Sequence, residues 1–296
     1  MNDALQQQLI NLKPEKEFYI GIDSDGCVFD TMEIKQKEAF CPMFIKYFNM
    51  QRISKYARET WEFVNLYSTN RGVNRFKALL KAFELLEKRP EVQARDMRFV
   101  NMTSIAEWVK IESKLGNPTL EKHAAQSNDE TVKLTLKWSK EVNQLISEIV
   151  FDIPPFPYVK QSLEKMKSNA DLIVVSQTPV EALKREWEEH NIDNYVRIIA
   201  GQEYGTKAEH IKYAAKGKYA DEKILMIGDA PGDQSAAKSN GVLFYPINPG
   251  HEEKSWKRFY DEALDRFFAG TYSGDYEAEL IMEFEAYLPE NPNWKM

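Results

Sequence analysis

The stretch from Phe18 to Asp30 constrains the fold of this chain more than any other segment. Its first five residues, Phe-Tyr-Ile-Gly-Ile, form a continuous run of the kind found in a central strand whose sheet is covered on both faces. The run ends in Asp23-Ser24-Asp25-Gly26, so two carboxylates follow the expected strand. Open α/β sheets bind ligands at the carboxyl ends of their strands, which favours a functional acid pair here. A simple turn is the alternative, because Asp-Gly after a strand is also a hairpin signal.

The segment that follows has a different pattern. From Thr31 to about Val150, apolar residues recur at three- and four-residue steps, as in the series Phe76, Leu79, Leu80 and Phe83. No strand candidate of comparable quality interrupts this region. We therefore expect an all-helical domain over residues 31–150, inserted after the first strand. Residues 1–30 and 151–296 would then form the other domain together.

Beyond a proline-rich connector at residues 154–157, short apolar runs alternate with helical segments. Such alternation predicts βαβ units with right-handed crossovers. The expected fold is therefore α/β, with a Rossmann-like parallel sheet and helices on both faces. The expected strands after the first cover residues 172–175, 196–199, 223–227 and 242–245.

Composition narrows the class of protein. Hydrophobic residues make up 43% and charged residues 29% of the 296, as in an ordinary globular protein of about two domains. The net charge of -7 disfavours nucleic acid and anionic membrane as partners. Residues 1–16 lack the apolar core of a signal peptide, and two cysteines make no disulfide framework. We expect a cytoplasmic monomer or homodimer.

Polar residues follow the first, second and fourth expected strands, and a lysine begins the helix after the third. In a parallel sheet the strand ends emerge at one edge, so residues distant in sequence can converge there. Several carboxylates suit Mg²⁺, and a lysine with a hydroxyl suits a phosphate. Singly, each residue has a structural alternative, since Asp forms turns and N-caps and Lys is usually solvated. The residues are Asp23, Asp25, Ser176, Gln177, Thr178, Lys207, Asp229 and Asp233. Lys207 is expected to be the first residue of a helix. Thr206 and Glu209 have the spacing of a capping box at its N-terminus.

These residues resemble, in order, the four motifs of the haloacid dehalogenase (HAD) superfamily: Asp23-Ser24-Asp25-Gly26, then Ser176, then Lys207, then Gly228-Asp229-Ala230-Pro231-Gly232-Asp233. The resemblance covers about residues 18–30 and 155–250. The helical segment lies where this family carries a C1-type cap domain. Within the family, an aspartate at the position of Asp25 accompanies phosphatases and phosphomutases. The chain is thus similar to the phosphatase branch, which includes phosphoglycolate phosphatase-like enzymes with helical caps.

The resemblance implies a role for each matching residue. Asp23 would be the nucleophile that forms an aspartyl-phosphate, and Asp25 the general acid and base. Ser176 would hydrogen-bond a phosphoryl oxygen, and Lys207 would neutralise charge. Asp23, the backbone carbonyl of Asp25, Asp229 and Asp233 would hold Mg²⁺, with Asp233 acting through water or orienting Lys207. Gln177 and Thr178 are candidate substrate-binding residues.

Two features leave questions open. Cys27 stands where the family usually has threonine, which removes a hydroxyl beside Asp25; a catalytic thiol is disfavoured, because no histidine is near in sequence. In the helical segment, Arg71 and Arg75 flank a polar turn. Arg71 is a candidate ligand for a substrate carboxylate or phosphate, but a solvated helix-joining turn explains it equally well.

The predicted function is that of a Mg²⁺-dependent phosphatase acting on a small phosphorylated metabolite, such as a phosphorylated carboxylate or sugar. Closure of the cap would exclude water until the aspartyl-phosphate forms. Two alternatives remain. A phosphomutase would use the same motifs, and a catalytically weak phospho-ligand-binding protein would use the helical domain as a partner surface.

Overall fold

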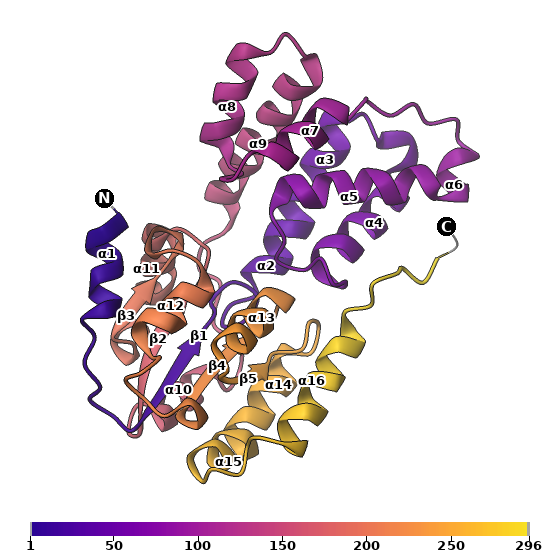
Figure 1. Cartoon of the computed structure of the whole chain (residues 1–296). Helices are drawn as coiled ribbons and strands as arrows, with labels where there is room; N and C mark the ends of the chain where they lie inside the picture. The colour runs from indigo at the N-terminus through magenta and orange to yellow at the C-terminus, as the bar shows by residue number, and fades with distance from the viewer. Residues whose placement is uncertain (1, 295–296) are drawn as a thin grey trace. The chain divides into compact units, whose positions relative to one another are not determined.

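The computed structural model describes residues 2–294 (Figure 1). These residues form two compact units: residues 2–32 with 152–288, hereafter the sheet unit, and residues 33–151 with 289–294, hereafter the helical unit. Within the described range, no helix combines the length and apolar character needed to cross a membrane.

The sheet unit contains a five-stranded sheet in the order β3-β2-β1-β4-β5. All neighbouring strands are parallel, which confirms the predicted α/β fold. The register pairs Ile22, the last residue of β1, with Val174 and Ile227, so three central strands end at nearly the same level. The strands are β1 (Phe18–Ile22), β2 (Ala170–Val175), β3 (Ile198–Ala200), β4 (Ile224–Gly228) and β5 (Leu243–Pro246).

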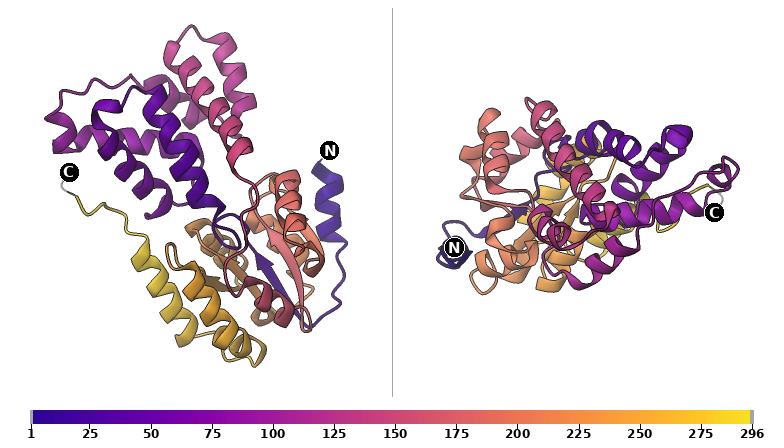
Figure 2. Two further views of the ribbon diagram at one scale, coloured as in Figure 1. Left: turned by 180° about the vertical axis from the view of Figure 1, so that it is seen from behind. Right: turned by 90° about the horizontal axis from the view of Figure 1, so that it is seen from above.

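Helices cover both faces of this sheet (Figure 2). Alternate strand residues pack against each helical layer. Ile20, Leu172 and Leu225 belong to one apolar cluster, whose helical elements are α10 (Val159–Met166), α11 (Val180–Glu189), α14 (Glu252–Arg258), η6 (Phe259–Ala263) and α15 (Leu264–Phe268). Tyr19, Ile173 and Met226 belong to the other, with α1 (Asn2–Ile10), α12 (Lys207–Ala214), α13 (Pro231–Asn240) and α16 (Asp275–Tyr287). Helix α16 also contributes Leu280 to the first cluster. Shorter turns are α2 (Thr31–Ile34), η3 (Asp193–Tyr195), η4 (Gln202–Tyr204) and η5 (Asp221–Lys223).

The helical unit has no strand among its described residues, as predicted. Its core is rich in aromatic side chains; the buried rings of Trp61 and Trp138 meet edge to face, with centroids 6.0 Å apart. The side-chain oxygens of Asn74 and Asp129 cap the helices that begin at Arg75 and Glu130, as expected of N-cap residues. The elements are η1 (Lys35–Phe40), α3 (Cys41–Tyr47), η2 (Gln51–Ile53), α4 (Ser54–Leu66), α5 (Arg75–Lys88), α6 (Pro90–Gln93), α7 (Thr103–Ile111), α8 (Asn117–Gln126) and α9 (Glu130–Ile149).

One segment differs from the expected domain organisation. Residues 289–294 were expected with the sheet, but they group with the helical unit. The physical reason is Trp294, whose ring lies against Phe63 and under the guanidinium of Arg89. No apolar periodicity marks this segment, so the sequence pattern offered no signal for its placement.

Candidate active site

Asp23 is the residue directly after β1, and its backbone continues the ladder with β4. Its N–H donates a hydrogen bond of 2.9 Å to the carbonyl of Ile227. The carboxylate is 3% exposed, and its Oδ1 accepts a hydrogen bond of 2.8 Å from the N–H of Ser24. Backbone groups therefore fix both the position and the rotation of this carboxylate.

Lys207 is placed by the N-terminus of α12. Thr206 and Glu209 form the predicted capping box, since Thr206 Oγ1 accepts from the N–H of Glu209 and Glu209 Oε2 accepts from the N–H of Thr206. From the first position of this helix, Lys207 Nζ reaches Asp23 Oδ2 at 2.7 Å and Asp233 Oδ1 at 2.6 Å. One ammonium thus bridges carboxylates from two sheet-edge segments that are far apart in sequence.

Asp229 and Asp233 come from the segment after β4. Asp229 follows the strand directly, and Asp233 lies in the first turn of α13, where its Oδ2 accepts from the N–H of Ala230 at 3.1 Å. One carboxylate oxygen from each of Asp23, Asp229 and Asp233 lies within 4.8 Å of the other two. The three side chains are buried. Gathered oxygens of this kind could hold a metal ion.

The charges of this cluster do not balance. Burial lowers the pKa of Lys207, but the charges of Asp23 and Asp233 outweigh burial and raise the pKa above its ordinary value. Burial raises the pKa of Asp233 to about 6, although Lys207 opposes the rise. Asp23 contributes to both shifts, because its charge attracts the Lys207 ammonium and repels a charge on Asp233. The site therefore has an excess of negative charge that a hard divalent cation with oxygen ligands would neutralise, and the donor set fits such an ion.

Ser176 and the two residues after it lie at the same edge of the sheet. Ser176 follows β2 and is buried, and its N–H donates to the carbonyl of Ala200 at 3.0 Å. Its Oγ accepts from the N–H of Thr178 at 3.3 Å. Gln177 Nε2 donates to the carbonyl of Gly205 at 2.9 Å, just before α12. These bonds tie the loop after β2 to the loop that carries Lys207.

Asp25 lies in a tight loop after β1. Gly26 has a φ of 81°, a conformation that favours glycine, and its N–H donates to the carbonyl of Phe29 at 2.9 Å. The Asp25 Oδ1 atom accepts a hydrogen bond of 2.5 Å from the hydroxyl of Thr31. Thr31 was not among the predicted site residues, because nothing in the sequence singles out a threonine six positions after an aspartate.

Two tryptophans also fix this loop and were not predicted. Trp187 Nε1 donates to Ser24 Oγ at 3.0 Å, and Trp256 Nε1 donates to the carbonyl of Cys27 at 2.7 Å. Both indoles are buried and come from helices on one face of the sheet. Burial, with the negative charges of Asp229 and Asp23, raises the pKa of Cys27 well above its usual range, so the thiol stays neutral.

Arg71 and Arg75, the two arginines of the predicted polar turn, both donate hydrogen bonds within the helical unit. Arg71 is 3% exposed, and its Nη1 donates to the carbonyl of Leu66 at 3.0 Å, at the end of α4. Arg75 Nη1 donates to Asn143 Oδ1 at 2.6 Å and to Ser139 Oγ at 3.1 Å, which links α5 to α9. Burial lowers the pKa of Arg75 to about 10. The alternative of a solvated Arg71 is therefore wrong, and substrate binding by Arg71 stays a prediction.

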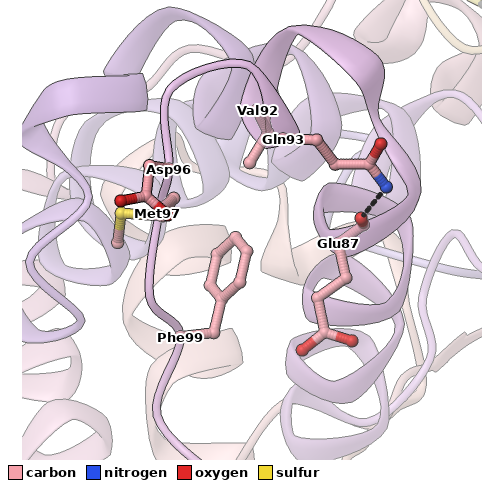
Figure 3. Close-up of a pocket in the computed structure, with 6 residues that line it drawn as sticks. All are labelled: Glu87, Val92, Gln93, Asp96, Met97 and Phe99. Atoms are coloured by element: carbon pink, nitrogen blue, oxygen red, sulfur yellow. Dashed lines mark hydrogen bonds between the residues drawn. The ribbon is translucent and has the colours of Figure 1, made fainter.

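The helical unit also contains an open cavity of about 440 Å³ (Figure 3). Gln93 Nε2 donates to the carbonyl of Glu87 at 2.9 Å at its rim. None of the predicted site residues lines it. Its lining residues are Glu87, Val92, Gln93, Asp96, Met97 and Phe99.

Solved structures of low sequence identity align with the chain. A haloacid dehalogenase-like hydrolase from Streptococcus pneumoniae is 16% identical, with 82% of this chain and 90% of that chain covered and a TM-score of 0.45. A putative phosphoglycolate phosphatase from Lactobacillus delbrueckii is 15% identical, with 83% and 92% covered and a TM-score of 0.47. A β-phosphoglucomutase from Clostridium difficile is 16% identical, with 85% and 96% covered and a TM-score of 0.48.

Among curated proteins, none matches the chain. A family model is more informative: the model described as haloacid dehalogenase-like hydrolase matches residues 99–246. The matched range contains Ser176, Lys207, Asp229 and Asp233, whereas Asp23 and Asp25 precede it. Since the match spans half of the 296 residues, the chain belongs to the family of haloacid dehalogenase-like hydrolases.

Proposed function

We propose that the protein is a Mg²⁺-dependent phosphatase that hydrolyses a small phosphate monoester, such as a phosphorylated carboxylate or sugar. The observation that carries the proposal is the position of Lys207 Nζ between Asp23 and Asp233, with Asp229 beside them. An oriented carboxylate next to an ammonium suits attack on phosphorus, because the cation offsets the repulsion between two anions.

Asp23 is the proposed nucleophile. One of its carboxylate oxygens forms a bond to phosphorus while the bond from phosphorus to the substrate's ester oxygen breaks. Asp25 donates its proton to the leaving oxygen, so the product departs as an alcohol. In the second half, Asp25 takes a proton from a water whose oxygen attacks phosphorus. The bond to Asp23 then breaks, which releases inorganic phosphate and restores both carboxyl groups.

Ser176 and Lys207 would bind the phosphoryl group. Because Ser176 Oγ accepts from the N–H of Thr178, its own proton is available for a phosphoryl oxygen. Lys207 stays protonated between its two carboxylates and supplies a fixed positive charge. Asp23, Asp229 and Asp233 would hold the Mg²⁺, with the backbone carbonyl of Asp25. When bound, the ion supplies positive charge that lowers the repulsion between Asp23 and the phosphate.

The test is phosphate release from a panel of phosphorylated carboxylates, phosphorylated sugars and a generic aryl phosphate, each with Mg²⁺ and with EDTA. We expect release that depends on Mg²⁺ and is abolished in Asp23→Asn. The matched control is Asp275→Asn, an exposed aspartate in the first turn of α16, which should keep wild-type turnover. Circular dichroism and Tm would show that both variants are folded.

Three results would count against the proposal. Full activity in Asp23→Asn would remove the nucleophile assignment. Isomerisation of a hexose phosphate without phosphate release would indicate a mutase. Saturable ligand binding without turnover across the whole panel would indicate a phospho-ligand-binding protein.

A further inference from the structure

We propose that residues 289–294 act as a strap, which leaves the sheet unit and docks on the helical unit through Trp294, and so limits how far the two units can separate. The strap begins where α16 ends. Phe284 and Leu288 are buried in the apolar cluster on one face of the sheet, at 1% and 3% exposure. The start of the strap is therefore fixed to the sheet unit.

The other end of the strap lies in a niche of the helical unit. The Trp294 ring meets Phe63 edge to face, with centroids 5.3 Å apart. The guanidinium of Arg89 lies 4.4 Å from the centroid of the Trp294 ring and 4.7 Å from that of Tyr56. Aromatic pairs and cation–π contacts of this geometry are attractive.

The niche is rigid because Arg89 is held independently of the strap. Arg89 is 4% exposed, and its guanidinium forms ion pairs with Glu59 and with Glu91, the latter at 3.3 Å. It also donates to Thr60 Oγ1 at 3.5 Å. The flat cation is thus oriented by α4 and α6, and the indole adds a second aromatic face to it.

Chain length turns this docking into a restraint. From Leu288 to Trp294 the backbone can span at most about 20 Å, at roughly 3.3–3.6 Å per residue. Pro289 and Pro292 restrict the backbone of this short segment further. The two units are also joined at residues 32–33 and 151–152, so the docked strap is a third connection between them.

The docked state is not optimal for the indole. Trp294 Nε1 is buried and has no hydrogen-bond partner among the described residues. A buried donor without a partner loses hydration without compensation, so the docked state carries a cost. This cost makes the docking of Trp294 weaker than its ring contacts alone would make it.

The test measures the distance between the units directly. Spin labels would be attached at Lys110→Cys in the helical unit and Lys184→Cys in the sheet unit, both exposed positions. Cys27 and Cys41 are buried and should not be labelled. Pulsed electron resonance then gives the distribution of label distances in the full chain. We expect Trp294→Ala to broaden the distribution and add longer distances.

Three further variants separate a strap from a merely stabilising contact. Trp294→Phe keeps an aromatic ring for Phe63 and Arg89 and should keep the narrow distribution. Met282→Ala, at an exposed apolar residue of α16, is the matched control and should change nothing. An insertion of about ten Gly and Ser residues between Asn291 and Pro292 lengthens the strap with Trp294 intact, and should broaden the distribution as Trp294→Ala does.

An unchanged distribution in Trp294→Ala would overturn the proposal. So would broadening in Trp294→Ala without broadening in the insertion variant, since Trp294 would then act only on the helical unit itself. Neither readout needs turnover. A protein that failed the phosphatase assay would leave the strap intact, and the reverse also holds.

Discussion

The hydroxyl of Thr31 donates a 2.5 Å hydrogen bond to Oδ1 of Asp25, across the turn that follows β1. Thr31 is 1% exposed, so water does not compete for this bond. The bond also bears on Cys27, which we expected to leave Asp25 without a neighbouring hydroxyl. Cys27 Sγ faces the carbonyl of Ile227 at 3.9 Å, and the hydroxyl beside Asp25 comes instead from Thr31.

Thr31→Val should lower kcat while leaving the fold intact. The valine has nearly the shape of threonine but cannot hold the Asp25 carboxyl in one rotamer, so proton transfer should slow by roughly 10-fold or more. The loss of one hydrogen bond should cost about 1 kcal/mol of stability. Steady-state kinetics with an aryl phosphate and urea unfolding measure the two effects. Thr31→Ser should retain most of the rate, and an unchanged kcat in Thr31→Val would show that Thr31 does not position Asp25.

The hydrogen bond from Thr31 to Asp25 could not be predicted from the sequence, whereas several site residues could. Asp23, Ser176 and Asp229 could be predicted because each follows an apolar run, and the strand ends of a parallel sheet share one edge. Lys207 could be predicted because its helix start has a capping box. The Thr31 bond depends instead on the path of a loop, which no local pattern encodes.

The remaining omissions have the same cause. Trp187 and Trp256 support the Asp23 loop from helices distant in sequence, and either would be read as an ordinary core residue from its spacing. The sequence did not decide whether Arg71 is a substrate ligand or a solvated turn residue, because the burial of an arginine depends on how helices pack. Trp294 lies in a segment without periodicity, so only tertiary contacts place it on the helical unit.

Lys207→Met should destabilise the protein most strongly when metal is absent. Removing the ammonium leaves Asp23 and Asp233 buried without their shared cation, a change that costs about 3–5 kcal/mol. Added Mg²⁺ should recover more stability in this variant than in the wild type, because it would neutralise the same carboxylates. Urea unfolding in EDTA and in Mg²⁺ measures both effects. The exposed Lys184→Met is the control; equal stability of Lys207→Met and wild type in EDTA would contradict the electrostatic argument.

Gly228→Ala should destabilise the protein and displace Asp233. A Cβ on Gly228 would lie 2.4 Å from both Cβ and Cγ of Asp233, so α13 has to shift and the contact from Asp233 to Lys207 lengthens. Overpacking of this kind costs about 1–3 kcal/mol, and turnover should fall with it. Gly232→Ala is the matched control, since nothing lies within 4 Å of its added Cβ and alanine favours the helix. The prediction is wrong if the two variants behave alike in urea unfolding and in kcat.

His210 should make the protein less stable in mild acid. The side chain is fully buried in α12, and both ring nitrogens are shielded from water. Burial, with the nearby charge of Lys207, lowers the pKa of His210 from 6.5 to about 4. The folded state thus favours the neutral ring, whereas the unfolded chain takes up a proton near pH 6.5.

The sign of the effect follows from this difference. The stability contributed by the neutral ring is present above pH 6.5 and is lost as pH falls toward 4, so the free energy of unfolding should drop by about 2 kcal/mol between pH 7 and pH 5. Other groups also titrate in this window, among them Asp233, whose raised pKa acts in the opposite direction. The comparison with His210→Leu isolates the histidine, because the variant keeps every other group. Urea unfolding at both pH values should show wild type losing about 2 kcal/mol more than the variant; equal losses would mean that His210 does not stay neutral in the folded protein.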